Sequence, residues 1–249
     1  MIAVVKYIEK RDQSMTPPVS NLKIRQVINP DEQNKVFAFR YSIYFKEWKK
    51  DFQSADHGKQ VITDSFDETA EIYAVFLNDE IVGTCRINYG SKEILPNSDL
   101  FQYAKFAYFY GTQNALISYL ILKPEYRYGS LFFKFFKEIY RRLLQRDVRS
   151  AFLTCYEPWL PQHKKIGCWA YRKALQYADQ GIVVPLVLLT RDHLRFRRVA
   201  SPLLPLLESY LINDSSFREA GSEEWQTGRN IYIQNSKSAG LNNGQKMDG

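Results

Sequence analysis

Four charged residues of the sequence, two aspartates and two arginines, are candidates for a functional site. Asp64 and Asp67 lie three residues apart in a polar stretch, which could put two carboxylates beside an incoming ammonium. Arg86 stands inside an otherwise apolar run. Because burying an isolated charge costs several kcal/mol, we expect it to meet Asp64 or Asp67 or to face a cleft. Arg40 follows the same logic on a helix. The alternatives are a solvated acidic loop for the carboxylates and purely structural ion pairs for the arginines.

The spacing of cysteine and histidine argues against a metal site. The three histidines, His57, His163 and His193, show no HxxxH or HExxH spacing. The three cysteines include no close pair, so the sequence indicates neither a disulfide framework nor a CxxC metal site. Cys85 and Cys155 stand in strand-like runs, where we expect buried, inert thiols.

The composition is that of an ordinary globular chain with an excess of positive charge. Its 249 residues, 45% of them apolar, suffice for a real core and exclude collagen-like and wholly disordered chains. The net charge of +7 speaks to partners: nucleic acid, an anionic membrane surface or an acidic carrier protein. The longest apolar run, residues 182–189, is far short of the ~20 residues that a spanning helix needs. The amino terminus lacks a signal-peptide pattern, so we expect a cytoplasmic protein.

Strand and helix signals alternate along the chain, which predicts an α/β fold with a single mixed central sheet flanked by helices. The clearest helix start is Asn29-Pro30, where an N-capping side chain precedes a proline at the first helical position. The expected strands cover residues 22–28, 71–77, 81–88, 115–122, 151–156 and 181–190. The expected helices run from Asn29 to about Trp48 and over residues 97–110, 129–147, 163–178 and 191–212.

These elements define one main domain with attached segments. We expect residues 1–20 to form an N-terminal extension, residues 21–190 the main domain and residues 191–213 a C-terminal helix. Residues 214–249 are rich in Ser, Gly, Asn and Gln, so we expect a polar, largely disordered tail.

Four motifs occur in order along the chain. The first is Arg40 followed by Tyr44, Phe45 and Trp48, similar to the pattern R-x-x-x-F followed by a tryptophan. The others are Asp64-Ser65-Phe66-Asp67, similar to D-x-x-D; Val82-Gly83-Thr84-Cys85-Arg86-Ile87, similar to V-G-T-x-R-L; and Leu122-Lys123-Pro124-Glu125-Tyr126-Arg127, similar to V-x-P-x-Y-R. With these motifs, over roughly residues 22–190, the chain resembles the GNAT acyltransferase superfamily, and within it the branch of acyl-homoserine-lactone (autoinducer) synthases and N-acyl amino acid synthases.

The chain departs from this family at two places. The donor motif R-x-x-G-x-G/A reads Arg127-Tyr128-Gly129-Ser130-Leu131-Phe132, so Ser130 and Phe132 replace glycines that let backbone amides approach a pyrophosphate. The synthases' E-x-S-R is replaced by Leu116-Ile117-Ser118-Tyr119. We therefore expect a general N-acyl transfer rather than homoserine-lactone formation.

The resemblance implies a role for each matched position. It implies catalytic roles for Arg86, Asp64, Asp67 and His163, the last standing where a tyrosine often protonates the departing thiolate. It implies acceptor binding by Arg40, Trp48 and Tyr119, and donor binding by Arg127, Gly129 and Ser130. It also implies no metal and no tightly bound cofactor, with acyl-CoA or acyl-phosphopantetheine on an acyl carrier protein as co-substrate. For His163 the alternative is a surface histidine beside two lysines.

Two features could support other readings. The phenylalanines at 132, 133, 135 and 136 and the aromatic run 101–110 could line an acyl-chain tunnel or simply fill the core.

The leading function is an N-acyltransferase that moves a fatty acyl group to a small amine such as an amino acid. The alternative is a degenerate GNAT-fold module that binds an acyl or small ligand. Nucleic-acid binding rests only on two arginine groups, at residues 141–149 and 191–198, with no recognised motif.

Overall fold

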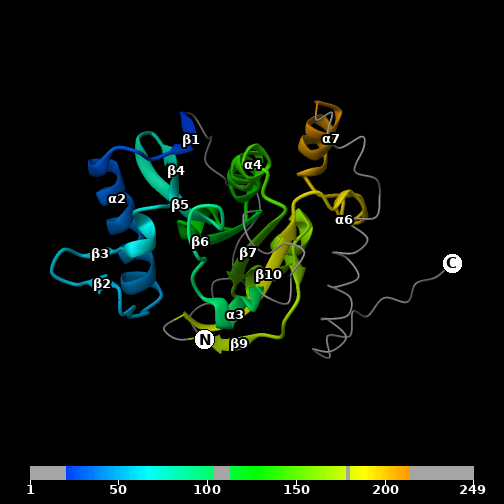
Figure 1. Cartoon of the computed structure of the whole chain (residues 1–249). Coiled ribbons are helices and arrows are strands. Elements are labelled where there is room, and N and C mark those ends of the chain that lie inside the picture. The colour runs from blue at the N-terminus through cyan, green and yellow to red at the C-terminus, as the bar shows by residue number, and fades with distance from the viewer. Residues whose placement is uncertain (1–20, 104–112, 178–179, 214–249) are drawn as a thin grey trace.

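A mixed sheet of eight strands lies at the centre of the residues that the computed structural model describes, 21–103, 113–177 and 180–213 (Figure 1). The strands follow the order β1-β4-β5-β6-β7-β10-β8, and β9 also pairs with β10. Their bounds are β1 Leu22–Gln26, β4 Glu71–Leu77, β5 Glu80–Tyr89, β6 Asn114–Leu122, β7 Ser150–Cys155, β8 Trp169–Ala170, β9 Leu175–Tyr177 and β10 Gly181–Leu189. Only β6 and β7 pair in parallel among these strands. The predicted fold class is confirmed.

Helices cover both faces of this sheet. They are α2 Pro30–Tyr41, α3 Ser98–Phe101, α4 Ser130–Gln145, α5 Leu160–Ile166, α6 His193–Arg198 and α7 Leu204–Asn213, with a π-helical segment η1 Ser42–Glu47 and short 3-10 turns η2 Ser65–Asp67, η4 Pro124–Tyr126 and η5 Glu157–Trp159. A small two-stranded sheet, β2 Ala55–Asp56 and β3 Val61–Ile62, lies beyond α2 (Figure 1).

Strand alternation assigns the two faces to different helices. On β4, Ile72, Ala74 and Phe76 pack with α2, whereas Tyr73 and Val75 belong to the cluster formed with α4. In Figure 1, α2 and α4 accordingly stand apart, on either side of the twisted sheet. The sheet is therefore buried on both faces at its centre, and polar groups there must be paired.

Local signals in the sequence set the best-defined elements. Asn29 caps α2 by accepting hydrogen bonds from the backbone amides of Asp31 (2.8 Å) and Glu32 (3.4 Å), and Pro30 occupies the first helical position. Asn78 and Asp79 both have positive φ, 50° and 63°, the conformation that a tight two-residue hairpin turn requires. The hairpin of β4 and β5 therefore stands where the sequence predicts it.

Two predicted helices are wrong. The helix expected over residues 163–178 ends at Gly167, whose φ of 112° stops α5, and the chain continues into β8 and β9. The helix expected over 191–212 is broken into α6 and α7, because Ala200 adopts a φ of 45°. Of the helix expected over 97–110, residues 98–101 are helical and residues 104–112 lie outside the described part. The extension 1–20 and the tail 214–249 also lie outside it.

Arginines at the C-terminal end of α4 pair with a buried carboxylate of the sheet. Glu71, 3% exposed, accepts hydrogen bonds from Arg142 (2.6 and 2.7 Å), from Arg146 (2.5 Å) and from the Tyr89 hydroxyl (2.9 Å). Asp147 pairs with Arg191.

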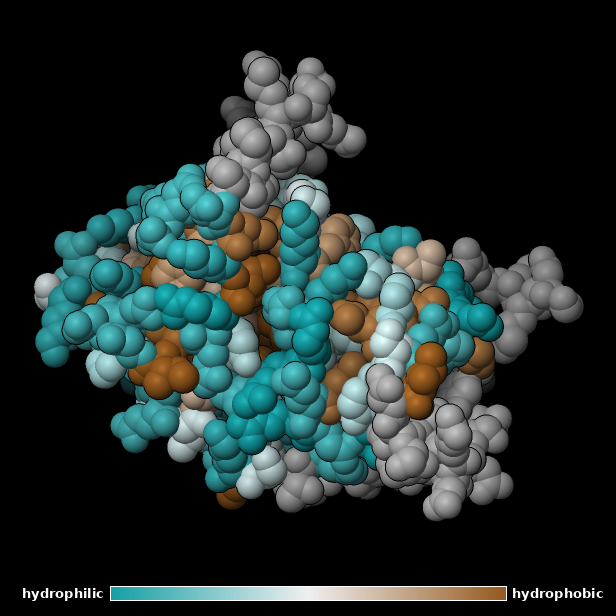
Figure 2. Space-filling model, turned by 90° about the horizontal axis from the view of Figure 1, so that it is seen from above, coloured by the Kyte–Doolittle hydropathy of each residue, from teal (hydrophilic) through white to brown (hydrophobic). Residues whose placement is uncertain are grey.

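Figure 2 shows a largely hydrophilic upper face on which hydrophobic residues form several separate groups. Within the described residues, no helix has the length and apolar character needed to cross a membrane.

We expect Glu71 to make stability depend on acid pH. Burial raises its pKa, but the hydrogen bonds from Arg142, Arg146 and Tyr89 outweigh burial and hold the pKa at about 2. Because this is below the unfolded value of about 4.3, the stabilisation is present above that pH and is lost as the pH falls toward 2. Denaturant unfolding at pH 7 and pH 3 should show a smaller pH dependence for Glu71→Gln than for the unmutated protein. An identical dependence in both would contradict this assignment.

Candidate active site

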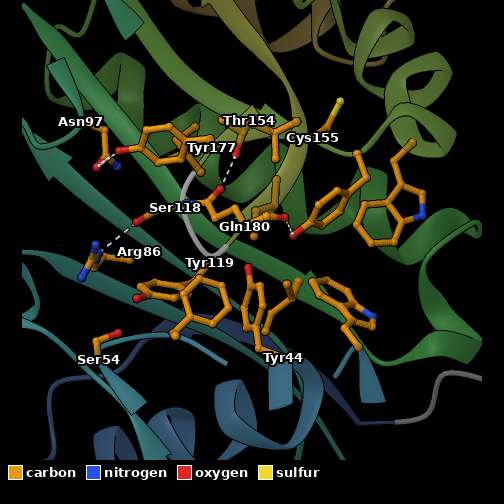
Figure 3. Close-up of a pocket in the computed structure, with 18 of the residues that line it drawn as sticks. Tyr44, Ser54, Arg86, Asn97, Ser118, Tyr119, Thr154, Cys155, Tyr177 and Gln180 are labelled. Atoms are coloured by element: carbon orange, nitrogen blue, oxygen red, sulfur yellow. Dashed lines mark hydrogen bonds between the residues drawn. The ribbon is translucent and has the colours of Figure 1, made fainter. Parts of the chain in front are cut away.

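A cavity of about 240 Å³ opens where the parallel strands β6 and β7 separate (Figure 3). Their register runs only from Asn114 opposite Ser150 to Leu116 opposite Phe152, so the strands diverge beyond that point. The residues lining the gap are Ile117, Ser118, Tyr119, Leu120 and Ile121 of β6 and Thr154, Cys155 and Tyr156 at the end of β7, with Asp64, Arg86, Tyr44, Trp48, Phe52, Ser54, Asn97, Trp159, His163, Tyr177, Gln180 and Val183 around it.

A β-bulge on β6 shapes one wall of the cavity. Thr84 of β5 faces Ile121 and Arg86 faces Ser118, so Tyr119 and Leu120 share one position opposite Cys85. Tyr119 adopts a φ of 50°, which is uncommon for a residue with a large side chain. The bulge interrupts the alternation of β6 and brings the Tyr119 ring next to the charged groups.

Asp67 pairs with both arginines that the sequence singled out. Arg40 is completely buried, and its Nη1 lies 2.9 and 3.0 Å from the two carboxylate oxygens of Asp67. Arg86 lies 3.3 Å from Asp67 and 2.5 Å from Asp64, in both cases through Nη1. The expectation that Arg86 meets Asp64 or Asp67 is fulfilled with both, and the solvated acidic loop is not what forms.

The two carboxylates differ in their surroundings. Asp67 also accepts hydrogen bonds from the Thr63 hydroxyl and from the Asp64 amide, both at 3.1 Å, and its side chain is 5% exposed. Asp64 caps η2 through the Phe66 amide at 2.9 Å, and its side chain is 27% exposed and lines the cavity. Asp67 thus anchors the arginines, whereas Asp64 is the carboxylate that a ligand can reach.

Tyr119 closes this corner of the cavity. Its hydroxyl donates to Asp64 Oδ2 at 3.4 Å, and the guanidinium carbons of Arg40 and Arg86 lie 4.1 and 4.8 Å from its ring centroid. Burial raises the pKa of Tyr119, so its hydroxyl stays protonated. Ser118 accepts a hydrogen bond from Arg86 Nε at 2.9 Å (Figure 3). The Nε and Nη2 groups of Arg40 lack hydrogen-bond partners in the described structure. The contact with the Tyr119 ring is therefore part of what stabilises the charge of Arg40.

Aromatic rings form the opposite wall. Trp48, predicted as an acceptor-binding residue, contacts the rings of Tyr44 (4.8 Å), Tyr156 (5.5 Å) and Trp159 (5.4 Å) between centroids. It borders both the main cavity and a smaller one of about 30 Å³ that also reaches Arg127. The cavity therefore has one charged corner, at Asp64 and Arg86, and one aromatic wall, at Trp48 and Trp159.

The predicted donor-binding residues lie outside the main cavity. Arg127 is bound to the protein through all three guanidinium nitrogens, with Nη1 and Nη2 2.5 and 2.7 Å from Glu47 and Nε 2.8 Å from the Leu122 carbonyl. Gly129 precedes α4 and Ser130 is its first residue, and no side chain caps this helix start. The structure therefore does not bring these three residues together with Asp64 and Arg86.

The phenylalanines of α4 belong to the core rather than to a tunnel. Phe135 and Phe136 are fully buried in the cluster between α4 and the sheet. Phe132 is 4% exposed and borders the smaller cavity. In the aromatic run 101–110, Phe101 and Tyr103 are buried in a second cluster, and residues 104–112 lie outside the described part. The core alternative thus holds for the residues that can be placed.

His163 is buried, not a surface residue, and lines the cavity. The residue is 4% exposed, its Nδ1 lies 2.8 Å from the Trp159 carbonyl oxygen, and Phe132 packs against the ring edge-on. Since a carbonyl only accepts, Nδ1 carries the proton. Burial lowers the pKa of His163 to about 4. At neutral pH the ring is uncharged and Nε2 is an acceptor, which disfavours the predicted role as proton donor to a thiolate.

We expect NMR of the imidazole to show this directly. His163 should stay neutral and Nδ1-protonated from pH 8 down to pH 5 and titrate at about 4, below the ordinary value of about 6.5. Because the folded pKa is depressed, the associated stability is present above the unfolded pKa and falls as the pH drops through the folded one. A midpoint at the ordinary histidine value would show an exposed ring and contradict the placement.

Several polar residues at the far end of the cavity were not predicted from the sequence. Tyr177 donates to Asn97 at 2.7 Å, Thr154 donates to Gln180 at 3.4 Å, and Tyr156 donates to the Gln180 carbonyl at 3.1 Å (Figure 3). Tyr177 lies in β9, where a helix was expected, and Gln180 directly precedes β10, whereas Thr154 and Tyr156 lie at the end of β7 and Asn97 directly before α3. Nothing in their local spacing signals that they meet.

The three cysteines are buried thiols and belong to no metal-binding group among the described residues. Cys85, Cys155 and Cys168 are free and buried, and burial raises the pKa of each thiol, that of Cys155 to about 12. Cys155 lines the cavity as a neutral thiol. Among the residues that the structure describes, no three His, Cys, Asp or Glu side chains gather in a way that could hold a metal ion.

Comparison with known proteins identifies the architecture. No family model and no curated protein matches the sequence. Among solved structures, the chain is similar to FeeM, an N-acyl amino acid synthase from uncultured soil microbes, with a TM-score of 0.58 and 12% identity over 75% of this chain and 98% of FeeM. It is also similar to BjaI, a CoA-dependent acyl-homoserine lactone synthase, with a TM-score of 0.55 and 14% identity over 73% of this chain and 91% of BjaI.

A third similar structure is TofI, solved in a ternary complex with an inhibitor and MTA. It has a TM-score of 0.55 and 10% identity, over 74% of this chain and 98% of TofI. With its mixed sheet, its bulged strand β6 and these neighbours, the chain has the GNAT-like fold of acyl-homoserine lactone synthases and of an N-acyl amino acid synthase.

Proposed function

We propose that the protein is a GNAT-type N-acyltransferase that moves a fatty acyl group from a thioester donor to the amine of a small acceptor such as an amino acid. The observation that supports this most is the partly exposed carboxylate of Asp64 in the cavity between β6 and β7, held by Arg86 and Tyr119. The fold similarity to acyl-transferring synthases agrees with this proposal.

In this reaction Asp64 binds the acceptor ammonium and orients it. The ammonium first gives up one proton, which passes by way of Asp64 to solvent, and the free amine attacks the thioester carbon. The C–N bond forms and the C–S bond breaks, and the second amine proton ends on the departing thiolate as a thiol. Arg86 and Asp67 act on Asp64 by holding it in place, and Arg40 holds Asp67.

The donor is acyl-CoA or an acyl group on an acyl carrier protein, both of which present the thioester on a phosphopantetheine arm. The arm enters past the aromatic wall at Trp48 and Trp159, and the phosphate lies near Gly129 and Ser130, where backbone amides at the start of α4 have no side-chain cap. Arg127 can bind the donor only when its ion pair with Glu47 is broken.

Release of free thiol tests the proposal. Purified protein with a long-chain acyl-CoA or acyl-carrier protein should release thiol only when a suitable amine is added, with formation of the N-acyl product in equal amount. The panel should contain the common amino acids and simple amines. Folded protein that releases no thiol with either donor across this panel would refute the enzyme proposal.

A second candidate function is a catalytically inactive module that binds an acyl or other small ligand. The observation that favours it is the engagement of Arg127 with Glu47, together with a phenylalanine at 132 where a glycine would give access to phosphates. Mass spectrometry of the protein as isolated separates the two functions. A retained lipid without turnover supports the binding module.

A further inference from the structure

We infer that Tyr44 is the hydrogen-bond donor to the oxyanion that forms on the thioester carbonyl during acyl transfer. This inference rests on the proposed function and deepens it, because it names the group that stabilises the transition state in the same cavity. Tyr44 lies in η1, the π-helical continuation of α2, and lines the main cavity.

Tyr44 differs from the other tyrosines of the cavity in having a free hydroxyl. Tyr119 donates to Asp64, Tyr156 to the Gln180 carbonyl and Tyr177 to Asn97. The Tyr44 hydroxyl has no hydrogen-bond partner among the described residues, and Figure 3 shows it pointing into the space between the strands. An unused donor that faces a cavity is available to a ligand atom.

Packing holds the Tyr44 ring in this orientation. The ring makes edge contacts with Trp48 and Phe52, both at 4.8 Å between centroids, and with Tyr119 at 5.9 Å. Backbone bonds reinforce the segment, since the Trp48 amide donates to the Ile43 carbonyl and the Lys50 amide to the Tyr44 carbonyl, each at 2.9 Å. A donor fixed before the substrate arrives does not have to reorganise during the reaction.

The position of Tyr44 relative to Asp64 fits the two halves of the reaction. Tyr119 touches both, through its hydroxyl to Asp64 and through its ring to Tyr44. Tyr44 and Asp64 both line the cavity, so an amine bound at Asp64 shares this space with the Tyr44 side chain. In the proposed complex the attacked carbonyl occupies the same space.

The chemistry favours a hydrogen-bond donor over a proton donor. When the C–N bond forms, the carbonyl oxygen gains negative charge and accepts the Tyr44 hydrogen bond; when the C–S bond breaks, the carbonyl reforms and Tyr44 keeps its proton. Burial raises the pKa of Tyr44 well above the usual value, with Tyr156 and Tyr119 adding to the effect. Such a hydroxyl is always protonated and would lose its proton to a thiolate, with a pKa of about 8.5, only at a large cost.

Steady-state kinetics of Tyr44→Phe test the inference. With acyl-pantetheine as donor and the best amine of the panel, kcat should fall about 100- to 1,000-fold while KM changes by less than about threefold. Tyr41→Phe is the matched control, because Tyr41 lies one turn earlier, bonds His57 at 3.0 Å and does not line the cavity. It should retain kcat within about threefold of the unmutated protein.

Two further measurements separate the proposed role from other roles. An acyl thiophenyl ester, whose thiol is more acidic, should suffer the same loss in Tyr44→Phe as acyl-pantetheine, because the oxyanion is the same. A non-reactive thioester with a ¹³C-labelled carbonyl can be bound in the absence of the amine. Its carbonyl stretch should lie at a lower frequency when bound to the unmutated protein than when free in solution. When bound to Tyr44→Phe, the stretch should return toward the frequency of the free thioester. A merely structural tyrosine would leave this stretch unchanged.

The outcomes decide between the inference and the proposed function. Turnover in the unmutated protein with an unchanged kcat in Tyr44→Phe overturns the role of Tyr44 alone. A loss that disappears with the thiophenyl ester overturns it in favour of proton donation to the thiolate. If the unmutated protein turns over no donor with any amine, the proposed function fails and the role of Tyr44 fails with it.

Discussion

Replacing Asp67 by asparagine is expected to lower the free energy of unfolding by about 3–5 kcal/mol, the usual cost of removing one partner of a buried ion pair. Asp67 is the acceptor for the fully buried Arg40, and it also pairs with Arg86. An asparagine would present N–H groups to guanidinium N–H groups and leave a buried charge uncompensated. It would also disturb the hydrogen bonds from Thr63 and the Asp64 amide.

Thermal and denaturant unfolding measure this effect. For a domain of this size the melting temperature should fall by about 2–4 °C for each kcal/mol. The control is Asp79→Asn at the tip of the β4–β5 hairpin, whose partner Lys23 in β1 is exposed and lies 3.1 Å away. That variant should stay within about 0.5 kcal/mol of the unmutated protein. Equal small losses in both variants would show that the buried cluster does not stabilise the fold.

Replacing Asp64 by asparagine is expected to leave the fold and remove the activity. The asparagine side chain can still cap η2 through its amide oxygen, and Arg86 keeps Asp67 as its partner, so we expect a stability loss of about 1 kcal/mol. The loss of the carboxylate that binds and deprotonates the ammonium should lower kcat/KM about 100- to 10,000-fold.

The comparison of Asp64→Asn with Asp67→Asn tests the division of roles between the two carboxylates. Asp67→Asn should lose stability first, whereas Asp64→Asn should lose turnover in a protein whose unfolding curve is nearly normal. Asp56→Asn serves as the control for a nearby exposed aspartate and should keep both. Full activity in Asp64→Asn, measured by thiol release, would remove Asp64 from the reaction.

The elements that could be predicted are those with strong local signals. The β4–β5 hairpin follows from two apolar runs around Asn78-Asp79, because few residues other than these and glycine tolerate a positive φ. The start of α2 follows from Asn29-Pro30. The pairing of Arg86 with Asp64 or Asp67 could be expected because a charge in a buried strand needs a counter-charge.

The prediction of a helix over residues 163–178 was wrong because a long-range contact, and not a local signal, decides the conformation there. The sequence there contains helix-compatible residues, but Gly167 takes a φ of 112°, and adding a Cβ at this position would bring it within 2.5 Å of the Phe196 ring. The chain therefore turns to let α6 pack close, and the following residues join β10 as short strands. Local propensity cannot show that a distant phenylalanine occupies this space.

The sequence by itself determined the alternation of strands and helices, the α/β class and the need of Arg40 and Arg86 for acidic partners, because these follow from periodicity, capping and the cost of a buried charge. Only the tertiary structure decided which carboxylate faces the cavity, that His163 is buried and neutral, that Arg127 is bound to Glu47 and that the Tyr44 hydroxyl has no partner among the described residues. The cavity itself depends on how β6 and β7 separate and on the bulge at Tyr119. Such features arise from contacts between residues far apart in the chain, and local residue patterns carry no record of them.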